Sequence, residues 1–288
     1  MYRRYSPLVS IITPVKNCSQ YIEQCIRNVL AQDYPFIEHV LIDGCSTDGT
    51  LDIIKKYNAM YPDKIVFISE PDGGACEAWN KGWNLSKGEI IGWLGGDDFY
   101  EPGAISTVVE FFKSKLDAYF VFGRCNLIDD RNRKILTVGI KDFDLDTVLS
   151  SCTNVIPNPS VFYRREVIKK IGQLRTDINC CDFDYWIRAG TIYKIYRINE
   201  VLSSFRIHKN STSGSRSSYR IYAIERYKLI RQYGGGLSLN CLIGYLISLI
   251  MDMLKYVFGS RLIYYRITYS LKNLLITIQY HIYGGKKG

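Results

Sequence analysis

The sequence predicts an α/β fold with a doubly wound sheet, followed by a C-terminal helical tail. Short apolar runs alternate with helix-type patterns about every 25 to 30 residues, which is typical of a sheet crossed by helices. Hydrophobic residues make up 47% of the 288-residue chain, which suffices for a large core. The composition then shifts near a run of three glycines at 234–236. We therefore expect one domain over residues 1–235 and a helical segment over 236–288.

The alternation can be followed from the N-terminus. A β-branched run predicts the first strand, and Ser19 is placed to cap the helix that follows it. Thr47 or Asp48 is placed to cap the second helix, and Pro102 to open the fourth. Beyond residue 123 the pattern becomes irregular, with a hairpin and one further helix. The expected strands are 9–12, 39–42, 65–68, 89–94 and 119–122, the helices 22–30, 51–57, 75–85, 102–112 and 164–171, and the hairpin 125–138.

Polar residues stand at the ends of the first four expected strands. They are Thr13-Pro14, Asp43, the segment 70–72 and the pair Asp97-Asp98. Ligands of doubly wound sheets bind at the carboxyl ends of the strands. Four consecutive strands that end in this way predict one shared site.

The pair Asp97-Asp98 is the feature most suggestive of a metal. It follows the apolar run 89–94 and Gly95-Gly96, where missing side chains allow a ligand to approach the backbone. Hard cations such as Mg²⁺ and Mn²⁺ take oxygen ligands and often bring a substrate phosphate with them. The alternative is a solvated turn at a strand end, and the pair alone does not decide between the two.

Cysteine use and the start of the chain both favour the cytoplasm. The nine cysteines are scattered, without a C-x-x-C pair or a zinc spacing, so we expect reduced thiols rather than a disulfide framework. The first residues lack the pattern of a secretory signal, and a strand pattern begins almost at once.

The net charge of +9 is concentrated at the C-terminus. Residues 1–205 contain 24 Lys and Arg against 26 Asp and Glu, whereas residues 206–288 contain 13 against 2. An apolar stripe from Ile263 to Ile282, bordered by Tyr and basic residues, suits an anionic membrane surface. The alternatives are a solvated basic face, a helical pair packed against the domain or against a second subunit, and a spanning hairpin. Nucleic-acid binding would explain the charge alone, so we expect no nucleic-acid partner.

Seven segments in order resemble the family 2 inverting glycosyltransferases, which have a GT-A fold, a Rossmann-like doubly wound mixed sheet. The resemblance covers residues 7–212. The segments are SIITPVKN (10–17), IDGCSTDGT (42–50), SEPDGGACEAWNKG (69–82), GEIIGWLGGDD (88–98), PNPSVFYRRE (157–166), CDFDYWIRAG (181–190) and SFRIHKNSTS (204–213).

The resemblance implies where a nucleotide-sugar donor and its metal bind. It assigns Asp98 to the metal, Mn²⁺ or Mg²⁺, and Asp97 to the metal or the ribose. His208 either completes the metal shell, contacts phosphate or only caps a loop. Many family members have Lys or Arg where this chain has Gly73, which puts a direct contact there in doubt. The implied donor-binding residues are Thr13, Pro14, Val15, Asp43, Asp72, Asn80, Asp97 and Arg206, with Arg206 as a clamp on the diphosphate.

The acceptor hydroxyl must lose a proton, and a carboxylate can act as its general base. The resemblance assigns this role to Asp182, in a position where the family has a Glu-Asp pair and this chain has Cys181. Asp184 is the alternate base. In an extended segment the two carboxylates would face the same way, whereas in a helix they would diverge. A single base without a second nucleophilic carboxylate fits one displacement with inversion.

The resemblance implies a metal-dependent transferase that moves one sugar from a nucleotide-diphosphate sugar, a UDP-sugar first among them, to a hydroxyl of a glycan or polyprenyl-linked acceptor. Surface polysaccharide or lipopolysaccharide assembly is the expected setting. The expected location is cytoplasmic, on the inner face of the cell membrane. The alternative from another class is a non-catalytic GT-A-like protein that binds glycans or membranes.

Overall fold

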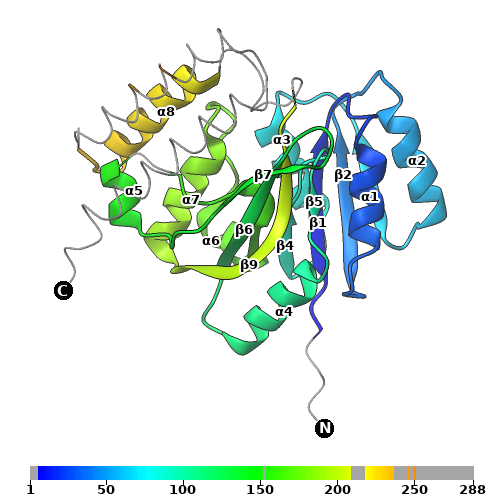
Figure 1. The fold of residues 1–288 in the computed structure, drawn as a ribbon, viewed down its shortest axis with the longest axis horizontal. Helices are drawn as coiled ribbons and strands as arrows, with labels where there is room; N and C mark the ends of the chain where they lie inside the picture. The colour runs from blue at the N-terminus through cyan, green and yellow to red at the C-terminus, as the bar shows by residue number, and fades with distance from the viewer. Residues whose placement is uncertain (1–5, 152–153, 209–217, 237–245, 247–249, 251–288) are drawn as a thin grey trace.

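Helices cover both faces of one mixed sheet in the computed structural model, which describes residues 6–151, 154–208 and 218–236 together with residues 246 and 250 (Figure 1). The sheet has nine strands in the order β3-β2-β1-β4-β8-β6-β9-β5, and β7 pairs with β6 beside this path. The strands are β1 Val9–Val15, β2 Ile37–Asp43, β3 Ile65–Ser69, β4 Ile90–Trp93, β5 Phe99–Tyr100, β6 Phe120–Ile128, β7 Lys134–Val138, β8 Val161–Arg164 and β9 Ile195–Arg206.

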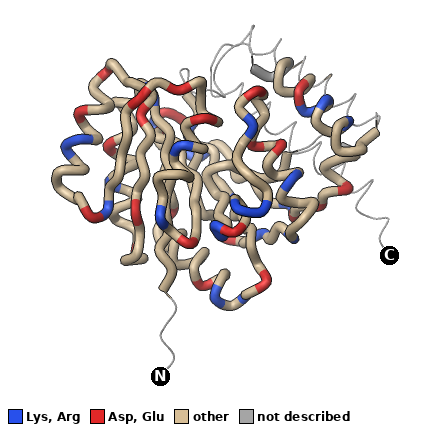
Figure 2. The backbone as a smooth tube through the Cα atoms, turned by 180° about the vertical axis from the view of Figure 1, so that it is seen from behind, with Lys and Arg blue, Asp and Glu red and all other residues tan. Residues whose placement is uncertain are grey.

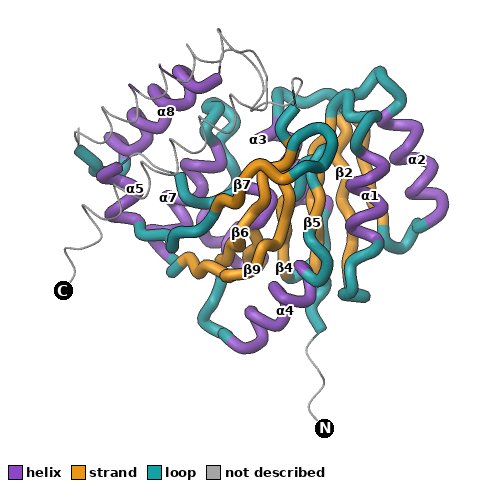
Figure 3. The backbone as a smooth tube through the Cα atoms, in the orientation of Figure 1, coloured by secondary structure: helices purple, strands orange, loops and turns teal. Residues whose placement is uncertain are grey.

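Alternating side chains of the strands face two separate apolar layers. Val9 and Ile11 of β1 pack in one layer, whereas Ile12 lies in the other, as the two-residue period of a strand requires. Helices α1, α2 and α4 contribute to the first layer and α3, α6 and α7 to the second, which gives the arrangement in Figure 3. The helices are α1 Ile22–Leu30, α2 Thr50–Met60, α3 Ala75–Leu85, α4 Ala104–Ser114, α5 Leu145–Ser151, α6 Arg165–Ile171, α7 Cys181–Ile192 and α8 Ser218–Gln232, with a 3₁₀ turn η1 at Asn158–Ser160.

The first four strands are parallel, as expected, and the sheet becomes mixed beyond them. Strand β8 runs antiparallel between β4 and β6, and β9 runs parallel to β6. Because β8 is reversed, the chain that enters it comes from the edge where β4 ends. The hairpin and the helix expected after residue 123 are confirmed as β6–β7 and α6, whereas the two-residue strand β5 was not expected.

The expected helix caps are displaced. Helix α1 begins after Tyr21, and the backbone N–H of Ser19 donates to Asp48 instead. Helix α2 has Gly49 at its N-cap, where the φ of +95° suits glycine. The Asp48 carboxylate, one residue earlier, still accepts the Thr50 N–H at 3.1 Å. Asp48 therefore caps the N-terminus of α2, although it lies one residue before the N-cap position.

The basic segment 236–288 lies almost entirely outside the described residues, so the expectations for it stay predictions. Over the described backbone, acidic and basic residues are interspersed (Figure 2). In the described part of the chain, no helix has both the length and the apolar character needed to cross a membrane.

Candidate active site

The register of the sheet places three strand ends in one row. Val15 pairs with Asp43, and Asp43 pairs with Ser69, so β1, β2 and β3 end together. The Asp43 carboxylate is fully buried and accepts hydrogen bonds from the Ser69 hydroxyl at 2.6 Å and from the Ser46 N–H. Asp43 therefore shapes the turn after β2, and its contact with a nucleotide base stays a prediction.

Residues next to these strand ends lie at the same edge of the sheet. The Val15 carbonyl accepts the Gly44 N–H at 2.9 Å, which joins the ends of β1 and β2. Asp72 lies against this junction, because a Cβ atom added to Gly44 would be 2.6 Å from Asp72 Oδ2. Thr13 is buried, with its hydroxyl 2.9 Å from His39 Nε2, and Pro14 is half-buried. The structure thus brings Val15, Asp43 and Asp72 together, whereas Thr13 faces the protein interior.

Asp97 and Asp98 follow β4 at the same edge. Gly95 leaves room for both carboxylates, since a Cβ atom there would lie 2.7 Å from Asp98 Oδ2 and 2.9 Å from Asp97 Oδ1. Asp98 is 3% exposed, and its Oδ1 accepts the Arg206 N–H at 2.8 Å. Burial and then the neighbouring Asp97 charge raise the pKa of Asp98 well above its usual value.

His208 lies beside this pair, and the metal or phosphate contact that the family resemblance implies for it stays a prediction. Its Nε2 atom is 2.9 Å from Asp97 Oδ2, and its ring is tilted against Tyr21 with centroids 4.8 Å apart. The two carboxylates suit a Mn²⁺ or Mg²⁺ ion, to which water and phosphate oxygen would also bind, whereas an imidazole is a less preferred ligand for these hard ions. Within the described residues, no three His, Cys, Asp or Glu side chains are gathered as a ready cage.

Arg206 has another role in this structure than the expected diphosphate clamp. It is 1% exposed, and its guanidinium donates to the Asp97 carbonyl at 2.8 Å, to Asn132 Oδ1 and to Gln24 Oε1 at 3.0 Å. It also lies over the Tyr21 ring, 4.7 Å from the centroid. The side chain is therefore committed to the protein, where it joins α1, the β6–β7 hairpin and the turn that carries Asp97.

Asn80 is likewise directed at the protein. Its amide donates to the Leu174 carbonyl and accepts the Leu174 N–H, both at 2.9 Å. These two bonds fasten α3 to the segment before α7. Contact between Asn80 and the nucleotide-sugar donor stays a prediction, and the two hydrogen bonds to Leu174 do not favour it.

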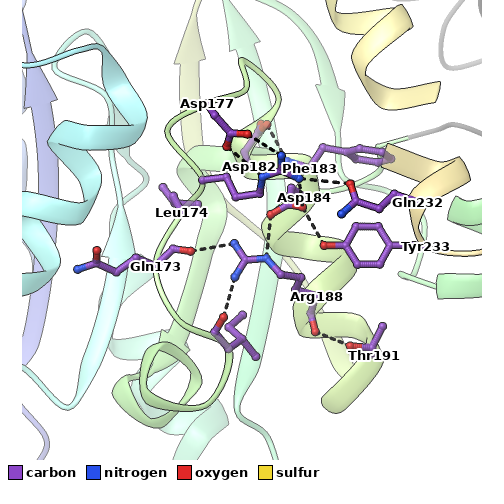
Figure 4. A network of polar contacts seen from close by, with 12 residues as sticks. Gln173, Leu174, Asp177, Asp182, Phe183, Asp184, Arg188, Thr191, Gln232 and Tyr233 are labelled. Atoms are coloured by element: carbon purple, nitrogen blue, oxygen red, sulfur yellow. Dashed lines mark hydrogen bonds and ion pairs between the residues drawn. The ribbon is translucent and has the colours of Figure 1, made fainter. Parts of the chain in front are cut away.

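Asp182 and Asp184 diverge because both lie in the first turn of helix α7 (Figure 4). Asp184 is fully buried and accepts hydrogen bonds from Arg188 Nε at 2.8 Å and the Tyr233 hydroxyl at 2.9 Å. Asp182 is partly exposed, and its Oδ2 accepts the Asn158 side-chain amide at 2.8 Å. The structure therefore separates a buried structural carboxylate from an accessible one.

The expectation of reduced thiols is wrong for one pair. Cys76 and Cys181 form a disulfide across 105 residues of sequence, because α3 and α7 meet in the same apolar layer. The described cysteines 18, 25, 45, 125 and 180 are free.

Asn158 is a site residue that sequence reasoning missed. It lies in the segment 157–166 that carries part of the resemblance, but its residue type alone did not point to a partner. The Asn-Pro-Ser run within η1 was the available signal, since a proline beside a polar residue indicates a fixed turn.

Comparison with protein families finds a match to the model described as glycosyl transferase family 2 over residues 10–181. An uncharacterized glycosyltransferase of Rickettsia typhi is 32% identical over 226 residues, which cover 73% of this chain and 67% of that protein. A Bacillus subtilis glycosyltransferase, TuaG, named for teichuronic acid biosynthesis, is 28% identical over 74% of this chain and 84% of its own. Chondroitin synthase of Escherichia coli is 28% identical over 72% of this chain but only 30% of its own length.

Solved structures support the fold. A mannosyltransferase from Pyrobaculum calidifontis in complex with GDP-Man and Mn²⁺ superposes with a TM-score of 0.61 at 18% identity, covering 95% of this chain and 81% of its own. Residues 1–349 of S. aureus TarS in complex with UDP-GlcNAc superpose with a TM-score of 0.59 at 15% identity, covering 93% and 92%. Both likenesses concern the fold alone.

Proposed function

Because this chain belongs to glycosyltransferase family 2 and has the GT-A fold, we propose that it moves one sugar from a nucleotide-diphosphate sugar to a hydroxyl of a glycan or polyprenyl-linked acceptor. The comparisons make the chain a glycosyltransferase related to enzymes of polysaccharide synthesis, and they set aside the non-catalytic alternative. The observation that carries the proposal is the accessible Asp182 carboxylate, held by η1, which packs against the strand that ends before Asp97 and Asp98.

The donor end of the proposal rests on the Asp97-Asp98 pair. These carboxylates, with His208 beside them, would hold a Mn²⁺ or Mg²⁺ ion, which when bound neutralises charge on the departing diphosphate. The GDP-Man and UDP-GlcNAc bound by the structural neighbours support a nucleotide-sugar as donor. Of the two nucleotides, we propose a UDP-sugar. Val15, Asp43 and Asp72 line the junction on which its nucleotide would rest.

The transfer step follows from the two carboxylates of α7. The acceptor oxygen attacks the anomeric carbon as the bond from that carbon to the diphosphate oxygen breaks. Asp182 accepts the proton that the hydroxyl loses. Asp184 is bound to Arg188 and Tyr233, so α7 offers no second carboxylate as a nucleophile. A single displacement inverts the anomeric centre.

The proposed setting is the inner face of the cell membrane, where the acceptor would be a lipid-linked surface glycan. The excess of basic residues beyond position 205 supports it. The full chain should bind anionic vesicles and not zwitterionic ones, and 0.5 M salt should release it. Equal binding to both vesicles would remove this part of the proposal.

The enzymatic proposal is tested with purified full-length chain, UDP- and GDP-sugars, and free and polyprenyl-linked glycans, with Mn²⁺, with Mg²⁺ and with EDTA. Release of nucleotide diphosphate should require metal and acceptor. Asp182→Asn should bind donor as the wild type does and lose transfer, and Asp98→Asn should lose metal-dependent donor binding. The control is Asp130→Asn, an exposed acid of the β6–β7 hairpin. Full transfer by Asp182→Asn would overturn the assignment of the base.

A further inference from the structure

The turn η1 is held rigidly beside the proposed base. The Ser160 hydroxyl, at the end of the turn, lies 2.6 Å from the Ser203 hydroxyl of β9 and donates to the Arg124 carbonyl of β6 at 3.1 Å. Ser160 and Ser203 are fully buried. Because β8 continues directly from the turn into the sheet, Asn158 projects from a fixed position rather than from a loose loop.

Each oxygen of the Asp182 carboxylate has one hydrogen-bond donor. Oδ2 accepts the Asn158 side-chain amide at 2.8 Å, and Oδ1 accepts the Phe183 N–H at 2.7 Å. The helix that carries Asp182 is fixed as well, since Glu225 of α8 accepts the N–H groups of Asn179 and Cys180. A carboxylate oxygen has a second lone pair, so each oxygen can still accept a proton from a substrate.

We propose that Asn158 is a positioning residue that orients the Asp182 carboxylate toward the acceptor hydroxyl. This inference rests on the proposed function, because it needs Asp182 as the base. An amide suits the task because it donates a hydrogen bond without bringing a charge or a proton of its own. A carboxylate free to rotate would spend less time in a productive geometry, and small misplacements of reacting groups are costly.

The experiment compares Asn158→Ala, Asn158→Asp and the matched control Asn154→Ala. Asn154 lies in the same segment, but its side-chain oxygen accepts the Ile156 N–H within that segment. Asn158→Ala should lower kcat roughly tenfold to a hundredfold, with donor KM and thermal midpoint unchanged. Asn154→Ala should keep kcat. An equal loss in both variants, or a lower midpoint that accounts for the loss in Asn158→Ala, would overturn the inference.

Asn158→Asp gives a second readout, the pH profile of kcat, which would not change if Asn158 only stabilised the fold. Two carboxylates at this separation share a proton, so the acid limb of the kcat profile should move to higher pH by about one unit or more. Cys180 and Tyr222, which interact electrostatically with Asp182, have pKa values raised by burial, the Cys180 thiol to about 12, so both stay protonated in the assay range. An unmoved profile would overturn the inference. If the wild type itself transfers no sugar, the proposed function fails instead.

The disulfide carries a second, independent inference. Cys76 lies in the first turn of α3, and Cys181, next to Asp182, is the first residue of α7. The bond therefore fastens the base-bearing helix to the helix that follows the Asp72 turn. Cys76 is partly exposed and Cys181 is 6% exposed, so a thiol from solvent would attack the Cys76 sulfur.

We infer that the Cys76–Cys181 bond is a redox-sensitive link that sets the position of α7. A dithiol reductant would attack Cys76 through one thiolate and release Cys181 as a thiolate, which takes a proton. The second thiol of the reductant would then displace Cys76, leaving two protein thiols and an oxidised dithiol. The bonds from Asn80 to Leu174 remain, so reduction should loosen the helix without unfolding the chain.

The test treats the wild type, Cys76→Ser and Cys181→Ser with a dithiol, with Cys45→Ser, an exposed free thiol, as control. Peptide mapping of alkylated thiols should find the bond in the oxidised wild type. Reduction should lower its kcat roughly threefold to tenfold, reversibly, and leave donor binding intact. The serine variants should start at the lower value and not respond. Absence of the disulfide, or an identical kcat before and after reduction, would overturn the inference. Peptide mapping detects the disulfide whether or not the chain transfers sugar, so its result does not depend on the proposed function.

Discussion

The Tyr233 hydroxyl donates a hydrogen bond to Asp184 Oδ1 at 2.9 Å, which joins the residue after α8 to the first turn of α7 (Figure 4). The other Asp184 oxygen accepts Arg188 Nε at 2.8 Å, and Arg188 also donates to the carbonyls of Ile171 and Gln173. Asp184 is thus the centre of a buried network that holds α6, α7 and the end of α8 together.

We expect Asp184→Asn to destabilise the protein. The amide keeps the shape of the carboxylate but loses the charge opposite Arg188. Its NH₂ group would also face Arg188 or the Tyr233 hydroxyl, both of which donate, so the free energy of unfolding should fall by about 2–4 kcal/mol. Urea denaturation measures this loss. The matched control is Asp182→Asn, which should unfold as the wild type does. A stable Asp184→Asn enzyme that lost only its transfer activity would instead make Asp184 the base.

Arg206→Lys should be destabilising as well. Lysine keeps the charge but cannot reproduce the planar fork that reaches Gln24, Asn132 and the Asp97 carbonyl. Loss of these buried bonds should lower the free energy of unfolding by about 3 kcal/mol. The measurement is the urea midpoint alongside donor KM. A stable variant whose only change was a higher donor KM would restore the diphosphate clamp.

Gly95→Ala should weaken metal use without weakening the fold. The added Cβ atom would meet the ends of the Asp97 and Asp98 side chains, which can move, so the free energy of unfolding should change by less than about 1 kcal/mol. Displacing the two proposed ligands should raise the Mn²⁺ concentration for half-maximal activity roughly tenfold or more. The control is Gly236→Ala, where an added Cβ would meet no atom within 4 Å. Unaltered metal dependence would argue against the pair as ligands.

The buried His39 predicts loss of stability in acid. Burial lowers its pKa from 6.5 to about 3, so between these values the unfolded chain binds a proton that the folded chain does not. The contribution of the neutral, buried His39 to the free energy of unfolding is therefore fully present above pH 6.5 and is lost progressively as the pH falls toward 3. At pH 5 the loss should be about 2 kcal/mol. Urea unfolding at pH 7 and pH 5 measures it, and His39→Gln should show a smaller difference between the two.

Elements with a strong hydrophobic period could be predicted from the sequence. Helix α3 has the predicted bounds, and the parallel strands β1 to β4 lie within a few residues of theirs. The site could be predicted in part, since strand ends in a parallel sheet share an edge. His208 was placed beside Asp97 only through the family resemblance.

Contacts between distant segments could not be predicted. Arg206 and Asn80 have side chains that could contact a nucleotide-sugar. Nothing in the sequence indicates that Arg206 hydrogen-bonds to Asn132 and Gln24 instead, or Asn80 to Leu174. Cys76 and Cys181 are 105 residues apart and follow no spacing rule. The resemblance favoured Asp182 over Asp184 as the base, but the different environments of the two carboxylates became clear only from helix α7, because an extended segment would have turned both the same way.

The reversed direction of β8 determines which part of the chain is free to vary. Segment 139–157 leaves the β6–β7 hairpin and returns at η1, so its two ends are fixed by the sheet while its length is not. Its exposed positions are free to vary, whereas Val148, Val155 and Ile156 are buried in apolar clusters and fix its path. Changes at these exposed positions should therefore leave Asn158 and Asp182 in place, because the buried Ser160 contacts and the strand that follows hold η1 in the sheet.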